Sequence, residues 1–270
     1  MNMLRSLRDL DKYSVYAADG DLGHVDDFLI DDEQWAVRYL VVESGGFRDR
    51  RGVLISPTAF RRADSESQRF HLALTLDQIR SSPDIDTDKP VSRQHEREYL
   101  DYYGYTPYWG QPALWGMGLN PVWLAGGTPD HVPTALAAAP AVDAHLRSAD
   151  ALRGYRIHGS DGAIGHVDDF LLDDENWAVR FLVIDTGAWG FGKKVLVAPR
   201  WADSISCVDR TIHLGISRAA VQNSPEWHPI APVNRELDHG LYDHYGRPVY
   251  WERDGHANEA QPQTRVATST

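Results

Sequence analysis

The stretch GHVDDFLIDDEQWAVRYLV, from Gly23 to Val41, returns 142 positions later as GHVDDFLLDDENWAVRFLV, from Gly165 to Val183. Sixteen of the 19 positions are identical, and the other three hold similar residues. A match of this length within one chain indicates a duplicated structural unit. The same offset relates further identical residues, among them Tyr13 and Tyr155, His71 and His213, and Tyr108 and Tyr250. Each copy therefore extends over roughly a hundred residues, the size of one domain.

The composition fits two modest domains and a linker. The 270 residues are 42% hydrophobic and 24% charged, which is typical of a globular chain with buried cores. Glycine, proline and alanine dominate from Gly110 to Val142, where Asp130 is the only formally charged residue. We predict a first repeat with its tail at 1–109, a linker at 110–142, a second repeat with its tail at 143–251, and a disordered end at 252–270.

Charge and cysteine content exclude some classes of protein. The formal net charge of −12 argues against broad nucleic-acid binding, because phosphate backbones are normally met by a basic stripe. The single cysteine, Cys207, excludes an internal disulfide and favours a cytoplasmic location. The sequence has neither a signal-peptide core nor an apolar run long enough to span a bilayer, so we expect a protein that is not integral to a membrane.

Turn dipeptides and β-branched runs predict a strand-rich unit in each copy. Asp19-Gly20 and Asp161-Gly162 are typical of tight hairpins, since both residue types accept positive φ angles. In the first copy we predict strands at 14–17, 22–30, 35–42, 53–56 and 69–75, a helical turn at 76–80, and a helix at 93–103 that ends at Gly104.

The repeated hairpin predicts two structural ion pairs. A turn at residues 31–34 would align the strands so that opposed positions sum to 65, which places Asp27 opposite Arg38. The second copy would place Asp169 opposite Arg180 in the same way. A carboxylate that accepts a bidentate guanidinium hydrogen bond fixes strand register. This register leaves both faces of the hairpin apolar, so each face needs a cover.

The motif from Ile164 to Val183, followed by Asp185-Thr186-Gly187, Val195 to Pro199 and Asn223 to Pro225, resembles the PRC-barrel family. That family is named for the cytoplasmic domain of the photosynthetic reaction-centre H subunit and includes the carboxyl domain of a ribosome maturation factor. The resemblance implies a small antiparallel β-barrel used mainly as a binding module. The expected fold is therefore mainly β, with two tandem PRC-type barrels, each followed by a short helical aromatic tail.

Repeated histidines and carboxylates suggest a different chemistry. His24 with Asp26, and His166 with Asp168, could act as a base and its orienting carboxylate, and His71 and His213 also recur. No repeated serine or cysteine nucleophile accompanies them. We therefore assign no catalytic residue and no cofactor.

Two clusters have some of the character of metal sites. Carboxylates that could bind Ca²⁺ or Mg²⁺ are Asp26, Asp27, Asp31, Asp32 and Glu33. Their spacing lacks the alternation and the glycine of a calcium loop. His239, Asp243 and His244 have helical ligand spacing, but the first copy retains only the aspartate, as Asp101. We predict no metal site.

Aromatic side chains are the better candidates for an interaction surface, because they supply large amphipathic area at low entropic cost. The candidates are Phe28, Trp35, Tyr39, Phe170, Trp177, Phe181, Tyr108, Trp109, Tyr250 and Trp251. The alternative is that these side chains cover their own barrel or the sister barrel.

The leading hypothesis is a non-enzymatic adaptor whose two barrels form a pseudo-twofold pair and bind a protein partner of unknown identity. Further homo-oligomerisation stays open. The resemblance offers photosynthetic or other electron-transfer complexes as partners, with the chain at the periphery of a membrane complex. The alternatives are a small-ligand binder or hydrolytic enzyme that uses the His and Asp positions, and a structural stress-related protein.

Overall fold

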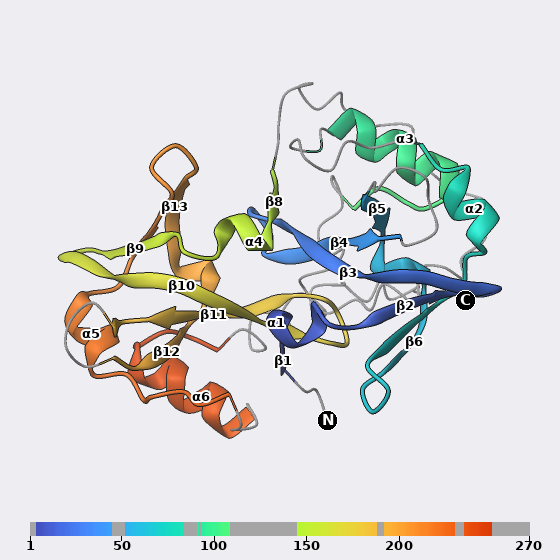
Figure 1. The fold of residues 1–270 in the computed structure, drawn as a ribbon. Helices are drawn as coiled ribbons and strands as arrows, with labels where there is room; N and C mark the ends of the chain where they lie inside the picture. The colour runs from blue at the N-terminus through green and yellow to red at the C-terminus, as the bar shows by residue number, and fades with distance from the viewer. Residues whose placement is uncertain are drawn as a thin grey trace, which may run out of the picture.

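The computed structural model describes residues 4–44, 52–83, 91, 93–108, 145–187, 192–229 and 235–249, except for the side chains of residues 93, 94, 235 and 236. The fold is mainly β and contains two seven-stranded sheets, which lie side by side with α3 outside one and α6 outside the other (Figure 1). The predicted linker at 110–142 and end at 252–270 lie outside the described residues.

Each repeat contributes six strands in the same order. The first repeat forms β2 (Ser14–Ala17), β3 (Gly20–Asp31), β4 (Ala36–Glu43), β5 (Gly52–Ile55), β6 (Phe60–Asp64) and β7 (Arg69–Leu72). The second forms β9 (Arg156–Gly159), β10 (Gly162–Asp173), β11 (Val179–Asp185), β12 (Lys194–Val197), β13 (Ala202–Ser206) and β14 (Thr211–Leu214). The sheet orders are β5-β4-β3-β2-β7-β6 and β12-β11-β10-β9-β14-β13.

Neither sheet forms the closed antiparallel barrel that the sequence suggested. The pairs β2–β7 and β9–β14 are parallel, whereas the other strand pairs are antiparallel. Among the described residues, the end strands β5 and β6 pair only with β4 and β7, respectively. The described strands therefore form open, curved sheets with free edges.

Short helices complete each repeat. They are α2 (Leu76–Arg80), α3 (Arg93–Tyr103), α5 (Arg218–Gln222), α6 (Arg235–His244), and 3-10 turns at Pro57–Ala59 and Pro199–Trp201. Gly104 and Gly246 follow α3 and α6 with φ of +68° and +61°. This left-handed conformation is the usual end of a helix, and glycine adopts it without steric cost.

The segment before each repeat adds a strand to the sheet of the other repeat. β1 (Leu4–Ser6) pairs antiparallel with β10, and β8 (Leu146–Ser148) pairs antiparallel with β3. Both strands have the sequence Leu-Arg-Ser, and each is followed by a helical turn, α1 (Leu7–Leu10) or α4 (Ala149–Leu152). We call these two segments the exchanged arms. They give each sheet its seventh strand.

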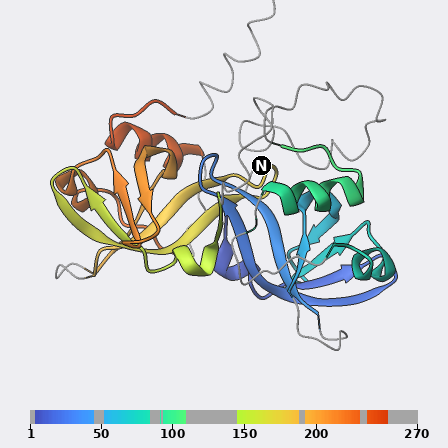
Figure 2. The same ribbon diagram turned by 90° about the horizontal axis from the view of Figure 1, so that it is seen from above.

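The tips of the two long hairpins also pair with each other. Ala36 and Ala178 form an antiparallel bridge. The N–H of Val37 donates to the carbonyl of Trp177 at 2.9 Å, and the N–H of Val179 donates to the carbonyl of Trp35 at 2.7 Å. These reciprocal bonds relate the two halves by an approximate twofold axis, and the long hairpins meet at the centre of the molecule (Figure 2).

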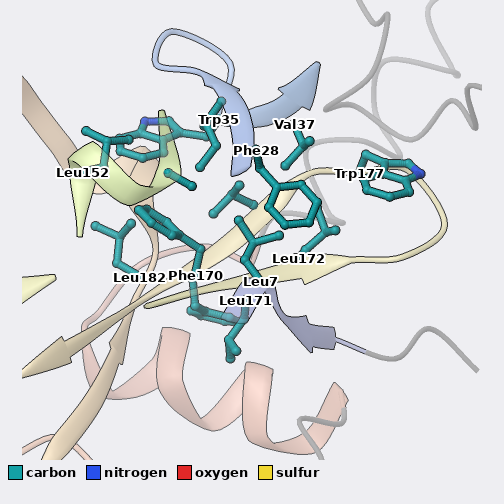
Figure 3. Packing of buried hydrophobic residues seen from close by; sticks show 14 of the residues in the cluster. Leu7, Phe28, Trp35, Val37, Leu152, Phe170, Leu171, Leu172, Trp177 and Leu182 are labelled. Atoms are coloured by element: carbon teal, nitrogen blue, oxygen red, sulfur yellow. The ribbon is translucent and has the colours of Figure 1, made fainter. Parts of the chain in front are cut away.

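One apolar core runs through both halves. Its buried members come from both repeats and from both exchanged arms, as the labelled side chains of Leu7, Phe28, Leu152 and Phe170 illustrate (Figure 3). Burial of apolar surface is the main favourable term in folding. Because the core is continuous, the two halves form one body.

Two β-bulges set the register of the β3–β4 hairpin. Val25 pairs with Val42 and Asp27 with Val41, and the register shifts between residues 25 and 27 and again between 29 and 30. The predicted register, with sums of 65, is therefore wrong. A bulge adds one residue to one strand, and a shift of one residue moves the following side chains to the other face.

The tail helix α3 covers the outer face of the first sheet. Tyr99 and Leu100 of α3 are buried in a second cluster with Leu29, Tyr39 and neighbouring strand residues. The Tyr99 hydroxyl donates to the carbonyl of Leu54 at 3.0 Å and accepts from the N–H of Ser56 at 3.1 Å. The two faces of the β3–β4 hairpin are thus covered differently: one face packs in the shared core, and the other packs against the tail helix α3.

Candidate interaction site

Each long hairpin holds a buried ion pair between an aspartate at its turn and an arginine of the next strand. The Nε and Nη2 atoms of Arg38 lie 3.2 and 3.0 Å from Oδ2 of Asp31, and the Arg38 side chain is fully buried. Arg180 contacts Asp173 in the same way, at 3.2 and 2.9 Å. The other carboxylate oxygen of Asp31 accepts the N–H groups of Glu33 and Gln34 and so closes the turn.

The predicted pairs of Asp27 with Arg38, and of Asp169 with Arg180, are therefore wrong. The turn closes with Ala36 opposite Asp31, so Asp27 lies opposite Val41, and Asp169 lies opposite Val183. Both arginines are buried in their hairpins, but the carboxylate that each contacts comes from the end of β3 or β10.

Asp27 and Asp169 instead hold the exchanged arms. Oδ2 of Asp169 accepts the Ser6 hydroxyl at 2.5 Å, and its Oδ1 accepts the N–H of Arg8 at 3.3 Å. Asp27 accepts the N–H of Asp150 at 3.1 Å, at the start of the other arm helix. Each carboxylate thus binds the exposed N–H groups of a helical turn from the opposite repeat. Burial raises the pKa of both carboxyl groups above the usual aspartate value.

The aromatic side chains of the long hairpins are inside the molecule. Phe28, Tyr39, Phe170 and Phe181 are at most 1% exposed, and Trp35 and Trp177 are 7% and 6% exposed. The interpretation of these six side chains as a surface for an external partner is therefore wrong. They fill the shared core, with the exception of Tyr39, which lies under α3.

The two tryptophans lie where the hairpin tips cross. Trp35 and Trp177 have positive φ values of 53° and 59°, which bulky residues rarely adopt. The Trp177 ring lies 5.1 Å from that of Phe60 and 6.0 Å from that of Phe70, both in the first repeat. The strained turn thus carries a side chain of one half into the other half.

Tyr108 belongs to a buried polar cluster that sequence reasoning did not identify. Its hydroxyl donates to Oε1 of Glu96 at 2.6 Å and lies 2.8 Å from Nε2 of His145. The guanidinium carbon of Arg38 stands 3.9 Å from the centre of the Tyr108 ring. Glu96 and His145 are fully or almost fully buried. This cluster joins α3, the end of the first tail, the hairpin and the beginning of the second arm.

The cluster had no clear signal in the sequence. Glu96 lies in a charged helix, and His145 follows the predicted linker. Burial raises the pKa of the Tyr108 and Tyr39 hydroxyls well above the usual tyrosine value, so both stay protonated. The remaining candidates Trp109, Tyr250 and Trp251 lie outside the described residues.

The repeated histidines and carboxylates do not converge. Nε2 of His24 lies 3.2 Å from Glu43 rather than beside Asp26, and both side chains are exposed. Asp168 bonds to Lys194 at 2.6 Å, while His166 remains exposed. A base with its orienting carboxylate is thus not assembled from these residues.

The other two repeated histidines lie against neighbouring rings. His71 lies 5.9 Å from the ring of Tyr16, and His213 lies 5.6 Å from that of His158. His239 and Asp243 form an exposed contact of 2.9 Å on α6, while His244 bonds to the carbonyl of Ala220. In the part of the chain that the structure describes, no three His, Cys, Asp or Glu side chains are grouped to hold a metal ion.

Comparison with protein families gives a match in the first repeat. A family model for the PRC-barrel domain matches residues 3–78, which run from the first arm to α2. A search of curated proteins finds no match. No helix among the described residues combines the length and apolar character of a membrane span. Residues 3–78 are therefore similar to a PRC-barrel domain.

Proposed function

We propose that this chain is a non-catalytic adaptor that binds another protein through an exposed edge of its fused sheets. The observation that carries the proposal is the PRC-barrel domain at residues 3–78, a domain that suggests protein interaction. The continuous core supports the same role, because a rigid body presents a preformed surface and loses little freedom on binding.

The candidate contact strand is β6. Among the described residues it pairs only with β7, and Arg61, Arg62 and Ala63 are exposed along it. An edge strand offers unpaired N–H and C=O groups to an extended segment of a partner. Two adjacent arginines favour an acidic segment over a basic one.

The equivalent edge of the second repeat has a different charge. Asp203 and Ser204 of β13 occupy the positions of Arg61 and Arg62, and both are exposed. The two edges are therefore a natural pair for comparison, since strand geometry is shared and charge is not.

The experiment is quantitative capture of partners by the tagged full-length chain from detergent-solubilised membranes and from soluble extract. Membrane-bound photosynthetic or electron-transfer complexes are the partner class that the family resemblance puts first. We expect one stoichiometric partner with the wild type, and its loss with Arg61→Glu, Arg62→Glu. The control is Asp203→Lys, Ser204→Lys on the equivalent edge, which should retain the partner.

Other outcomes separate the alternatives. Equal capture of the partner by both variants would show that the partner does not contact β6. Failure to recover any stoichiometric partner would overturn the adaptor proposal and favour a structural role. A small-ligand or hydrolytic function rests on the repeated His and Asp positions. At these positions His24 contacts Glu43, and Asp168 contacts Lys194.

A further inference from the structure

The seam between the halves is nearly symmetric in its backbone. The hairpin tips exchange equivalent hydrogen bonds, from Val37 to Trp177 and from Val179 to Trp35. The arms β1 and β8 reach equivalent places on β10 and β3. If the two halves were identical, a side chain close to the axis would face its own copy.

Residues 11 and 153 are equivalent positions that meet at this seam with opposite charges. Asp11 follows α1 and Arg153 follows α4, and Nη2 of Arg153 lies 2.9 Å from Oδ2 of Asp11. Their side chains are only 23% and 15% exposed. Two identical halves would bring two carboxylates or two guanidinium groups together here, and juxtaposed like charges at an interface are unfavourable.

Residues 8 and 150 are a second equivalent pair with opposite charges. Arg8 reaches across the seam to Asp168, with Nη2 donating to the main-chain oxygen at 2.7 Å and Nη1 lying 3.5 Å from Oδ1. Asp150 instead bonds to Arg153 of its own arm. A second copy of Asp150 in place of Arg8 would put two carboxylates side by side at Asp168.

Other charges at the seam are the same in both halves, so they do not distinguish one half from the other. Arg5 contacts Asp174 at 2.9 Å, and its equivalent Arg147 contacts Asp32 at 2.7 Å. Asp27 and Asp169 are common to both repeats and are partly or fully buried. Arg153 also approaches Asp169, with 3.7 Å between Nη2 and Oδ1. Beyond Arg5 and Arg147, each half supplies one further arginine, Arg8 from the first half and Arg153 from the second, and these two are not at equivalent positions.

We propose that the seam is an interaction surface specific for the unlike half. The first repeat is built to accept a PRC-type repeat with Asp in place of Arg8 and Arg in place of Asp11, and to reject its own copy. The second repeat has the reverse preference. The duplication has thus replaced a self-complementary surface by two complementary ones, which disfavours association of two chains through like halves.

The test exchanges these charges in the full-length chain. Arg8→Asp, Asp11→Arg gives both halves the residues of the second repeat, and Asp150→Arg, Arg153→Asp gives both halves those of the first. The variant with all four changes restores an unlike pair with the roles reversed. We expect each double variant to lower the urea midpoint by at least about 0.5 M, and the fourfold variant to recover most of that loss.

The control exchanges a third diverged pair on the same helical turns. Asp9→Ala with Ala151→Asp changes exposed residues and should leave the midpoint unchanged. A fourfold variant whose midpoint falls by the sum of the two double-variant losses would overturn the proposal, as would double variants as stable as wild type.

A milder cycle covers the case in which a charge-reversed variant does not fold. Asp11→Asn, Arg153→Gln and the two together remove charge without creating a like pair. We expect the double variant to lower the urea midpoint by less than the sum of the two single-variant decreases. Strictly additive losses would mean that the two residues do not recognise each other and would also overturn the proposal.

Discussion

Arg38 and Asp31 form a closed ion pair, with 3.0 Å between Nη2 and Oδ2 and side chains that are 0% and 1% exposed. The same pair recurs as Arg180 and Asp173, so it belongs to the repeated motif. Its function is structural, because it links the end of β3 to β4 at the turn where the two halves cross.

Removal of one charge from this pair should be strongly destabilising. Asp31→Asn removes the buried charge that Arg38 contacts at the turn, which we expect to lower the free energy of unfolding by about 3–5 kcal/mol. Chemical denaturation measures this change. The control, Asp26→Asn, alters an exposed carboxylate on the same strand and should have little effect. Equal midpoints for the two variants would contradict the importance of the pair.

Trp177→Ala tests whether one half completes the core of the other. The side chain is 6% exposed and lies against Phe60 and Phe70, so we expect a loss of about 3–5 kcal/mol. Hydrogen exchange should also become faster in β6 and β7 of the first repeat. Val208→Ala, at a side chain that is 96% exposed, is the control. Faster exchange confined to the second repeat would show that the tryptophan supports only its own half.

Asp11 should make the stability depend on pH in the mildly acidic range. Burial raises the pKa of its carboxyl to about 6 from 3.8, and this outweighs the attraction of Arg153, which lowers the pKa. The folded state therefore binds the proton more readily than the unfolded state. The contribution of this group is fully present below about pH 3.8 and is lost as the pH rises through about 6.

The measurement for Asp11 is urea unfolding of wild type and Asp11→Asn between pH 5 and pH 7. Asp27 and Asp169 also have raised pKa values, so the comparison with the single variant isolates the share of Asp11. We expect wild type to lose more stability than the variant over this interval. Parallel curves would show that Asp11 titrates near its ordinary value.

Tyr108→Phe tests the buried polar cluster. The change removes the hydroxyl that donates to Glu96 and lies beside His145, and an unsatisfied buried acceptor costs about 1–3 kcal/mol. Tyr102→Phe is the matched control, because its hydroxyl bonds to the carbonyl of Gln78 at the surface. Similar unfolding midpoints for the two variants would mean that water or another group replaces the Tyr108 hydroxyl.

Several individual strands and helices were predictable from the sequence. The predicted strand at 14–17 coincides with β2, the predicted helical turn at 76–80 with α2, and the predicted helix at 93–103 with α3. The end of α3 at Gly104 was also predicted correctly. These features depend on residues within a few positions of each other: glycine at a left-handed end, β-branched runs and capping residues. The edge strand β6 and the two arms were missed, since short strands carry little periodic signal.

The sequence by itself determined that the chain contains a repeated, strand-rich unit and that aspartate and arginine hold its hairpin together. Only the tertiary structure decided which aspartate binds Arg38. The turn lies one residue later than predicted, with Ala36 opposite Asp31, and two bulges each shift the register by one residue, which strict alternation does not predict. It also decided that Asp27 binds the arm of the other repeat and that Trp177 packs against Phe60 of the other half. Those contacts join residues more than a hundred positions apart, and their energy comes from burial and charge in the assembled seam, which no local stretch of sequence contains.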